Sequence, residues 1–331
     1  MAESRGKTTR SISVIGVGNM GGSIARNLID SPCSDSVVGS YDVVQSLVEE
    51  LYQYARKAGK NKSDRPPGGV ASAVEGADCV LVVLSTEDQC AQLCFGTGSS
   101  VSLISSMRPG SCVMVCSTVS SEWSRRAAKK FEGAGIHFVD CPVSGGPKRA
   151  REGKLTVMAS GDIDSIEFAM PVLSAMGMVH VISGGAGSAS TVKVIHQLLA
   201  GVNLCVSAEA LTLATKFGID PKQMYEVVND GAGASFMFAD RGRRMIEDES
   251  PKTRMQLSTF VNDLNAVGIV ARDLDCPLPL ASAALQQFVV GEAMGLGRKD
   301  DSQIVKVYES LTKVAVCENG GAAAVGEETY L

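Results

Sequence analysis

A glycine-rich segment near the start of the chain most restricts what this sequence can fold into. The stretch VIGVGNMGGS, residues 14–23, holds four glycines in ten residues and overlaps an apolar run at 11–15. Glycine inside a helix or strand costs roughly 0.5–1 kcal/mol relative to alanine, so these glycines indicate backbone that turns tightly or is approached closely. Two interpretations are open at this point: a loose surface turn, or a turn against which another backbone or a ligand packs.

The spacing of these glycines favours the second interpretation. Gly16-x-Gly18-x-x-Gly21 stands between a strand-like run and SIARNLID, a helix candidate. In that context the first glycine permits a tight turn, the second lets a pyrophosphate approach the backbone, and the third packs helix on strand. The helix N-terminus would offer N–H groups and a partial positive charge to the phosphates. A glycine-rich turn without a ligand is the alternative.

The hydrophobic pattern predicts an α/β protein with an all-α C-terminal part. Short apolar runs alternate with helix-length segments in the first half, at 11–16, 37–41, 79–84, 112–116, 137–140, 156–159 and 178–182. Strands alternating with helices predict a Rossmann-type, doubly wound, mainly parallel sheet. From Ser188 the strand signals stop, and a long interdomain helix is predicted to run to Gly218. Further helices are expected at 221–229, 258–273, 278–295 and 302–316.

This pattern predicts four segments. They are an N-terminal arm at 1–10, a dinucleotide-binding domain at 11–187, a helical substrate and oligomerisation domain at 188–316, and a disordered tail at 317–331.

Composition excludes several classes of protein. The 331 residues are 45% hydrophobic, with a net charge of −5, which argues against a nucleic-acid binder. No uninterrupted apolar run is long enough to span a bilayer, and the first residues lack the apolar core of a secretory signal. Ten cysteines scattered through apolar runs indicate reduced thiols, so a cytoplasmic protein is expected. The three histidines lack neighbouring ligands, and no metal site is expected.

Asp42 follows the second predicted strand, where dinucleotide folds place an acidic residue. A carboxylate there accepts hydrogen bonds from the ribose hydroxyls and repels a 2′-phosphate. The following residues, Val43 and Val44, supply no arginine for that phosphate, so NAD is favoured over NADP. Asp42 as a simple turn or helix-cap residue is the alternative, and several basic residues at 56–62 leave an opening for NADP.

Two further stretches carry polar groups in apolar surroundings. DCPVSGG, residues 140–146, follows a strand, and Ser144 with Gly145 and Gly146 is able to turn N–H groups and a hydroxyl toward an anion such as a carboxylate. A purely structural turn is equally consistent with it. In the long helix, Lys193 and Gln197 are four residues apart and so share one face. From periodicity alone, a lysine that extends its amine to water is the preferred interpretation.

The chain resembles the β-hydroxyacid dehydrogenase family, which includes 3-hydroxyisobutyrate dehydrogenase, tartronate semialdehyde reductase and L-threonate dehydrogenase. The likeness runs from about Ser11 to Ser310. GVGNMG resembles the family's cofactor loop, DCPVSGG its substrate loop, GSASTVKVIHQ its catalytic helix, and FVNDLNAV a later stretch near nicotinamide and substrate. Within the family, STVKVIHQLLAG, MYEVVNDGAGASFMF and CPLPLASAAL are most similar to L-threonate dehydrogenases.

The resemblance implies roles for individual residues. Lys193 would be the general acid and base, with Gln197 beside it. Ser144, Gly145 and Gly146 would hold the substrate carboxylate, and Phe236 would close the substrate pocket. The residues implied to line the cofactor are Gly16, Gly18, Asn19, Met20, Asp42, Leu84, Ser85, Thr118 and Asp263.

Two positions depart from the family pattern. Most members carry asparagine where this chain has Gln197, whereas L-threonate dehydrogenases share the glutamine. Glutamine keeps the amide but reaches one methylene further. Asn262 stands where the family usually has lysine, so a cation beside the nicotinamide or substrate is lost, and substrate preference is affected.

The resulting prediction is NAD-dependent oxidation of a small hydroxy acid, with L-threonate or a related sugar acid as the best candidate substrate. Lys193 would take the hydroxyl proton while hydride passes to the nicotinamide, which requires a neutral amine. Oxidation of 3-hydroxyisobutyrate or another 3-hydroxyacid is one alternative. An imine reductase, which usually lacks this lysine, and a non-catalytic dinucleotide-binding scaffold or sensor are the others. Apolar helices predict a homodimer or homotetramer, with no nucleic-acid or membrane partner.

Overall fold

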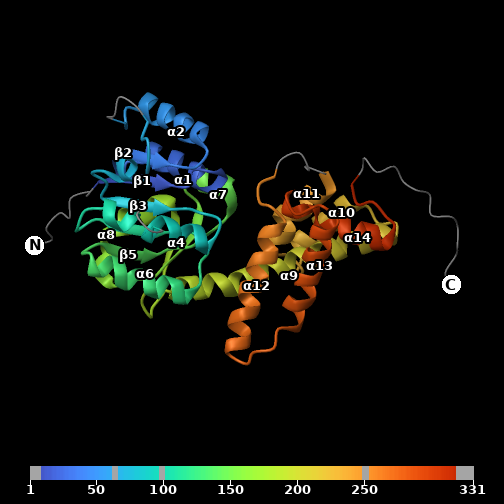
Figure 1. Cartoon of the computed structure of the whole chain (residues 1–331). Helices are drawn as coiled ribbons and strands as arrows, with labels where there is room; N and C mark the ends of the chain where they lie inside the picture. The colour runs from blue at the N-terminus through green and yellow to red at the C-terminus, as the bar shows by residue number, and fades with distance from the viewer. Residues whose placement is uncertain (1–8, 62–65, 97–100, 248–252, 318–331) are drawn as a thin grey trace, which may run out of the picture. The chain divides into compact units, whose positions relative to one another are not determined.

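The computed structural model describes residues 9–61, 66–96, 101–247 and 253–317. The chain forms two compact units, Met1–Lys193 and Val194–Leu331 (Figure 1). The division falls inside the long helix α9 (Ser188–Lys216). The predicted domain boundaries stay predictions. Most of the predicted N-terminal arm, residues 1–8, and most of the predicted tail, residues 318–331, lie outside the described residues.

The first unit is built on a five-stranded parallel sheet in the order β2-β1-β3-β4-β5. Its strands occupy the predicted apolar runs and confirm the predicted fold class. They are β1 (Arg10–Ile15), β2 (Ser34–Tyr41), β3 (Cys79–Val82), β4 (Cys112–Val115) and β5 (His137–Asp140).

Alternating side chains of these strands enter two different hydrophobic clusters. In β3, Cys79 and Leu81 join one cluster, while Val80 and Val82 join the other. Successive side chains of a strand point to opposite faces of a sheet, so a strand covered on both faces must be apolar at every position. The continuous runs CVLV and CVMV are therefore the consequence of a sheet covered on both sides.

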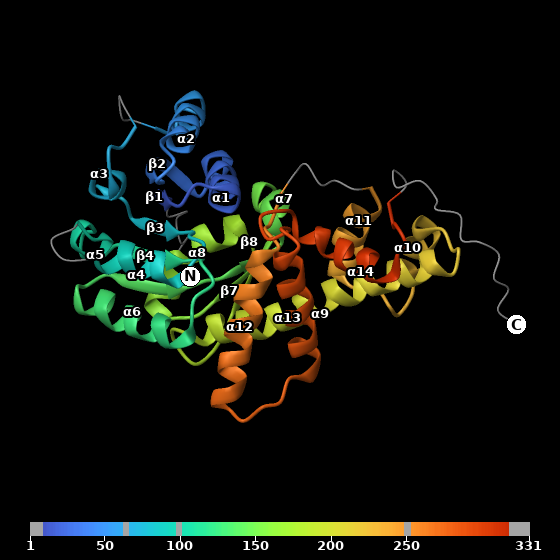
Figure 2. The same ribbon diagram turned by 45° about the vertical axis from the view of Figure 1, so that its right-hand side comes forward.

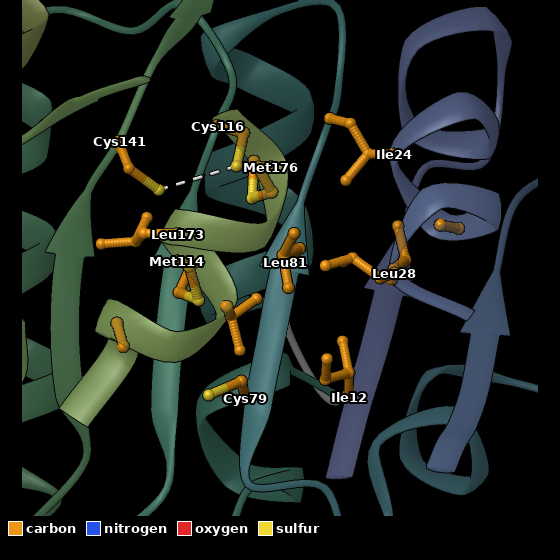
Figure 3. Packing of buried hydrophobic residues seen from close by; sticks show 14 of the residues in the cluster. Ile12, Ile24, Leu28, Cys79, Leu81, Met114, Cys116, Cys141, Leu173 and Met176 are labelled. Atoms are coloured by element: carbon orange, nitrogen blue, oxygen red, sulfur yellow. Dashed lines mark hydrogen bonds between the residues drawn. The ribbon is translucent and has the colours of Figure 1, made fainter. Parts of the chain in front are cut away.

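Helices supply both covers. Figure 3 shows side chains of α1 (Asn19–Asp30) and α8 (Ile163–Met176), among them Leu28 and Leu173, packed against Leu81 and Met114 of the sheet. The opposite cluster includes Trp123 and Phe131 of α6 (Ser121–Gly133). The other helices of this unit are α2 (Gln45–Lys57), α3 (Val70–Val74), α4 (Glu87–Phe95), α5 (Leu103–Ser106) and α7 (Gly146–Arg151).

Two of the predicted strands belong to a second sheet instead of extending the first. This sheet has the order β6-β7-β8, formed by β6 (Val143–Ser144), β7 (Leu155–Ala159) and β8 (Gly177–Val181). β7 pairs with β6 in antiparallel and with β8 in parallel fashion. The chain reverses after Ser144, so β7 returns beside β6. An isolated bridge between Asp140 and Ser160 connects this sheet to the end of β5.

The regular elements of the second unit, as far as the structure describes it, are helical, as predicted. α12 (Ser258–Asp273) and α13 (Pro279–Ala293) run side by side (Figures 1 and 2). The rings of Phe260 and Phe288 stack between them with centroids 5.0 Å apart. The remaining elements are α10 (Pro221–Asp230), the π-helix η1 (Phe238–Gly242), α11 (Arg243–Glu247), the 3-10 helix η2 (Asp301–Ile304) and α14 (Val305–Thr312).

The helix α9 bears on the expectation that no segment spans a bilayer. By length and composition alone, it is the one helix among the described residues that is able to cross a bilayer. Half of its most apolar window is buried inside the protein, and core helices of globular proteins pass the same test. Polar residues such as Asn203 interrupt its apolar run, which is why no uninterrupted run stood out in the sequence.

Candidate active site

The glycine-rich turn after β1 combines two kinds of glycine. Gly16 has φ +85°, and a Cβ there would lie 2.3 Å from the carbonyl oxygen of Val83. A Cβ on Gly21 would lie 1.8 Å from the carbonyl oxygen of Gly16. Backbone packing therefore explains both of these glycines. Nothing lies within 4 Å of a Cβ built on Gly18, so packing against the protein does not require glycine there.

Gly18 is also the N-cap residue of α1, and it makes no side-chain cap hydrogen bond. The first N–H groups of the helix that starts beside it lack partners within the helix. A site with this geometry accepts a phosphate group close to the backbone. The turn fits a dinucleotide pyrophosphate better than it fits the alternative of a ligand-free surface turn.

The strand order places the predicted cofactor residues of the first unit at the same edge of the sheet as this turn. β2 and β3 lie on opposite sides of β1, which makes the carboxyl end of β1 the point where ligands bind in sheets of this order. Because the strands are parallel, the residues that follow each of them meet at one edge of the sheet. These residues are Gly16 to Met20 after β1, Asp42 after β2, Leu84 and Ser85 after β3, and Thr118 after β4.

Hydrogen bonds hold the loop after β3 in place. The N–H of Leu84 donates to Ser117 Oγ at 2.7 Å, and the N–H of Ser85 donates to Gln89 Oε1 at 3.1 Å. Gln89 completes a capping box with Thr86 at the start of α4. Leu84 and Ser85 thus stand on a loop that is fixed to its neighbours on both sides.

Asp42 connects two loops at the sheet edge. Its Oδ2 accepts a hydrogen bond from the N–H of Val17 at 2.8 Å, and its Oδ1 accepts one from Val44 at 2.9 Å. Helix α2 begins at Gln45 with Val44 as its N-cap, so Asp42 turns the chain before the helix without capping it. An ionised carboxylate has about four acceptor sites, which leaves room for ribose hydroxyls. Val43, beside it, is 88% exposed.

The serine-glycine loop has a backbone that demands glycine. Ser144 ends β6, and Gly145 and Gly146 follow with φ +133° and +75°. These values lie where L side chains are strained. Nothing lies within 4 Å of a Cβ built on Gly146, so that residue adds open space as well as a sharp turn.

Lys193 and Gln197 are buried, each with 7% of its surface exposed. Ile195 and Leu199, on the same helix, are 57% and 58% exposed. An amphipathic surface helix shows the opposite distribution, with apolar side chains inside and polar ones outside. The interpretation of Lys193 as a lysine that extends into water, which periodicity alone favoured, does not agree with this burial.

Gln197 lies between two polar partners in the second unit. Its Nε2 donates to Asp263 Oδ2 at 2.5 Å, and its Oε1 lies 3.0 Å from Nδ1 of His196. Asp263 comes from α12 and is 9% exposed. The structure therefore joins Gln197 to Asp263, a residue that the family resemblance assigned to the cofactor. Of the other predicted residues in this unit, Phe236 is half exposed and Asn262 is exposed.

Sequence reasoning did not single out Asp140, the last residue of β5. It is fully buried, and its carboxylate accepts hydrogen bonds from Ser160, Gly187 and Ser190. Burial raises the pKa of Asp140, against the lowering effect of these hydrogen bonds. The sequence did contain a signal for it, because the strand HFVD ends with a charged residue after two apolar ones. The hydrogen-bond partners of Asp140, however, are 20 to 50 residues away along the chain.

Two family models match the chain and together cover most of it. The NAD-binding domain of 6-phosphogluconate dehydrogenase matches residues 11–195, and the NAD-binding domain of NADP-dependent 3-hydroxyisobutyrate dehydrogenase matches residues 187–308. The chain belongs to the β-hydroxyacid dehydrogenase family. It is an NAD(P)-dependent hydroxyacid dehydrogenase that acts on CH–OH donors, which sets aside the scaffold and imine reductase alternatives.

Individual members of the family are similar over most of their length. The dehydrogenase is 40% identical to an L-threonate dehydrogenase of Escherichia coli O6:H1 over 73% of this chain and 79% of the relative. It is 35% identical to an L-threonate dehydrogenase of Pectobacterium atrosepticum over 91% and 95% of the two chains. The crystal structure of a 3-hydroxyisobutyrate dehydrogenase from Salmonella typhimurium matches with a TM-score of 0.80 and 33% identity, over 90% of this chain and 99% of that one.

Proposed function

We propose that this dehydrogenase oxidises L-threonate or a closely related sugar acid, with NAD as its preferred cofactor and Lys193 as the proton-transfer group. The burial of Lys193 on a helix whose exposed face is apolar is the observation that carries this proposal. The names of the two L-threonate dehydrogenases described above support the substrate. Asp42, followed by two valines, supports NAD.

In this proposal Lys193 acts as the general base in oxidation. Its neutral amine accepts the proton of the substrate hydroxyl, and in the reverse direction its ammonium returns that proton. When bound, the oxidised nicotinamide supplies the carbon that accepts the hydride. Gln197 presents an amide to the substrate hydroxyl, and its orientation is set by the hydrogen bond to Asp263.

The remaining residues bind and orient. The hydroxyl of Ser144 and the backbone N–H groups of Gly145 and Gly146 would hold the substrate carboxylate, as a concave group of donors holds an anion. Phe236 would close the pocket over the substrate, and Asn262 would contact substrate in place of the family's usual lysine. The residues proposed to contact the cofactor are Gly16, Gly18, Asn19, Met20, Asp42, Leu84, Ser85, Thr118 and Asp263.

A second candidate substrate comes from the Salmonella relative. Its name, 3-hydroxyisobutyrate dehydrogenase, at 33% identity, makes 3-hydroxyisobutyrate or another 3-hydroxyacid the alternative. A 3-hydroxyisobutyrate molecule lacks the additional hydroxyl groups of a sugar acid. A site built to hydrogen-bond those hydroxyls rejects a substrate without them, because buried polar groups would be left unpaired.

A substrate panel tests the proposal directly. Purified protein is mixed with NAD or NADP and with L-threonate, 3-hydroxyisobutyrate, L-serine or tartronate, and the formation of reduced cofactor is followed by absorbance. We expect L-threonate with NAD to give the highest kcat/KM of the panel. A higher kcat/KM for 3-hydroxyisobutyrate would transfer the proposal to the second candidate.

We also propose that the protein forms a homodimer or homotetramer and is located in the cytoplasm. Exposed apolar side chains along α9 support self-association: Leu199, Val206 and Leu213 are each at least 50% exposed and recur every seven residues. Exposed apolar patches mark interaction surfaces. The ten cysteines are free thiols, and this supports the cytoplasmic location because reducing compartments keep thiols in that state.

A further inference from the structure

One buried carboxylate, that of Asp140, connects the strand that leads into the serine-glycine loop to the helix that carries Lys193. All the residues in this arrangement belong to the first compact unit. Asp140 is 0% exposed, and the donors that contact its side chain are all uncharged. A buried charge of this kind is costly unless several hydrogen bonds satisfy it, and this carboxylate accepts four.

On one side, the carboxylate caps the start of α9. Its Oδ2 accepts hydrogen bonds from the N–H groups of Gly187 at 3.0 Å and Ser190 at 2.9 Å. Its Oδ1 accepts the hydroxyl of Ser190 at 2.7 Å. The first N–H groups of a helix lack partners within the helix, and a negative charge at that end is favourable. Asp140 therefore acts as the cap of a helix that begins 48 residues further along the chain.

Ser160 reinforces the same junction. Its hydroxyl donates to Asp140 Oδ2 at 3.2 Å and accepts the N–H of Ala189 at 3.0 Å. The first turn of α9 is thus attached to two side chains, those of Asp140 at the end of β5 and Ser160 just after β7. The segment before the helix, Ser183 to Gly187, contains three glycines with positive φ, a composition that gives the chain little stiffness of its own.

On the other side, the main chain of Asp140 is fixed in the sheet. Its N–H donates to the carbonyl of Ser160 at 2.9 Å, and its carbonyl accepts the N–H of Ser160 at 2.8 Å. The next residue, Cys141, donates its N–H to the carbonyl of Val115 at 2.9 Å. The loop Ser144–Gly146 begins three residues later. Asp140 therefore fixes both the chain that leads into this loop and the start of α9.

We propose that Asp140 is a positioning residue for Lys193. Lys193 lies three residues after Ser190, so the two share one face of the helix about one turn apart. By fixing Ser190 against β5, Asp140 sets the distance between the lysine amine and the loop proposed to hold the substrate carboxylate. This inference rests on the proposed function, in which the two groups act on one substrate.

Two substitutions at Asp140 separate geometry from charge. In Asp140→Asn, the amide oxygen accepts the N–H groups of Gly187 and Ser190, and the amide NH₂ donates to the Ser190 hydroxyl, which rotates to accept it. That variant keeps the cap. In Asp140→Ala the cap is lost. Because a displacement of about 1 Å costs on the order of 100-fold in rate, we expect kcat to fall about 10- to 100-fold in Asp140→Ala. In Asp140→Asn, kcat should stay within a few-fold of wild type.

Asp162 provides a matched control in the same unit. It is the N-cap residue of α8, and its exposed carboxylate accepts the N–H of Ser165 at 2.9 Å and its hydroxyl at 2.5 Å. Asp162→Ala should lose less thermal stability than Asp140→Ala, because Asp162 is exposed and Asp140 is buried, and it should retain wild-type kcat. Both variants should keep the wild-type Kd for NAD. If Asp140→Ala folds and its kcat equals that of Asp162→Ala, the positioning role is refuted.

NMR of the Lys193 side chain tests this positioning role without a measurement of turnover. Protein labelled with ¹³Cε-lysine gives a Lys193 resonance, assigned by its loss in Lys193→Arg. That resonance should move in Asp140→Ala and remain in place in Asp162→Ala. If wild type oxidises no acid of the panel, the proposed function fails, while this resonance still decides whether Asp140 positions the lysine.

A milder pair of variants serves if Asp140→Ala does not fold. Ser190→Ala removes the 2.7 Å hydroxyl contact but keeps the backbone N–H donor. Ser165→Ala does the same at the cap of α8. We expect a several-fold loss of kcat and a displaced Lys193 resonance in the first variant, with neither change in the second. Equal behaviour of the pair would refute the inference.

Discussion

Each glycine in the glycine-rich turn after β1 has its own physical explanation. Alanine at Gly16 or Gly21 would collide with backbone oxygens, whereas alanine at Gly18 would meet open space. The first two substitutions therefore threaten the fold, and we expect the third to hinder the proposed approach of a phosphate. The sequence motif does not show this difference. The atoms around a Cβ built on each glycine do.

Lys193 carries the proposed chemistry, and its removal is the most direct test at the residue scale. We expect Lys193→Ala to lower kcat by about 100-fold or more, the usual contribution of a general acid or base, while the Kd for NAD stays within about twofold because only transition-state stabilisation is lost. Steady-state kinetics and NAD titration measure the two quantities. Lys216→Ala, on the same helix, is the control and should keep wild-type kcat. Near-normal turnover by Lys193→Ala would refute the assignment.

Asp42 tests cofactor choice at the same scale. Asp42→Ala removes the acceptor proposed for the ribose hydroxyls and the charge that repels a 2′-phosphate. We expect the ratio of kcat/KM for NAD to that for NADP to fall by at least about tenfold, which corresponds to about 1.4 kcal/mol. Asp30→Ala, which removes another half-exposed carboxylate of this unit, should leave the ratio unchanged. An unchanged ratio in Asp42→Ala would exclude it from cofactor selection.

Among the elements of the second unit, a buried ion-pair cluster joins η1 and α11 to η2. Arg244 pairs with Asp300 at 2.6 Å and with Asp240 at 2.8 Å, and Arg241 pairs with Asp301 at 3.0 Å. Arg244, Asp300 and Asp301 are each at most 3% exposed. Removing one partner of such a cluster leaves an uncompensated buried charge.

We therefore expect Arg244→Ala to destabilise the protein by about 3–5 kcal/mol. The next residue offers a matched control, since Arg243 pairs with Glu247 on the surface and is 66% exposed. Arg243→Ala should cost at most about 1 kcal/mol, as exposed pairs do. Denaturant unfolding of the two variants measures both free energies. Equal losses would show that the buried cluster contributes no more than a surface pair.

Acid should reduce the difference between wild type and Arg244→Ala. Burial acts to raise the pKa of Asp300, but the Arg254 N–H, the Arg244 guanidinium and Ser302 together hold that pKa below its ordinary value. A carboxyl with a lowered folded pKa stabilises the fold above its unfolded pKa, and this contribution is lost as pH falls through the folded value. The difference between the two unfolding free energies should therefore begin to narrow below about pH 4, the ordinary range of an aspartate, and should continue to narrow until pH has passed the lower folded pKa of Asp300.

Elements with a strong local pattern were predictable, and those defined by distant contacts were not. The sequence predicted a helix over 258–273, where α12 lies, and the parallel strands of the first sheet, because periodicity is local. The separate sheet of β6, β7 and β8 depends on pairings across the chain reversal after Ser144, which no local pattern encodes. The π-helix η1 had no sequence signal either.

The candidate site divides in the same way. The glycine turn, Asp42 and the serine-glycine loop follow strands, and strand ends are visible in a sequence. The burial of Lys193 was not visible, because Ile195 and Leu199 make the exposed face of its helix apolar, and periodicity then assigns the lysine to water. The role of Asp140 was not visible for a related reason, since its partners lie far along the chain, just after β7, in the loop after β8 and in α9.

For the whole molecule, the exposed apolar face of α9 bears on assembly. Leu199, Val206 and Leu213 are 58%, 50% and 58% exposed at seven-residue spacing, the repeat with which helices pack against a partner helix. We expect light scattering after size exclusion to give two or four times the mass of one chain. A monomer at micromolar concentration would refute self-association.

A charge on that face should weaken the assembly if this face is the interface. Val206→Glu would bury a carboxylate against apolar side chains, which is costly without a partner, so we expect the dissociation constant to rise at least about tenfold, the equivalent of 1.4 kcal/mol. Gln223→Glu adds the same charge at an exposed position of α10 and should leave the mass unchanged. If Val206→Glu also keeps the wild-type mass at every concentration, the copies associate through a different surface, and the apolar face of α9 needs another explanation.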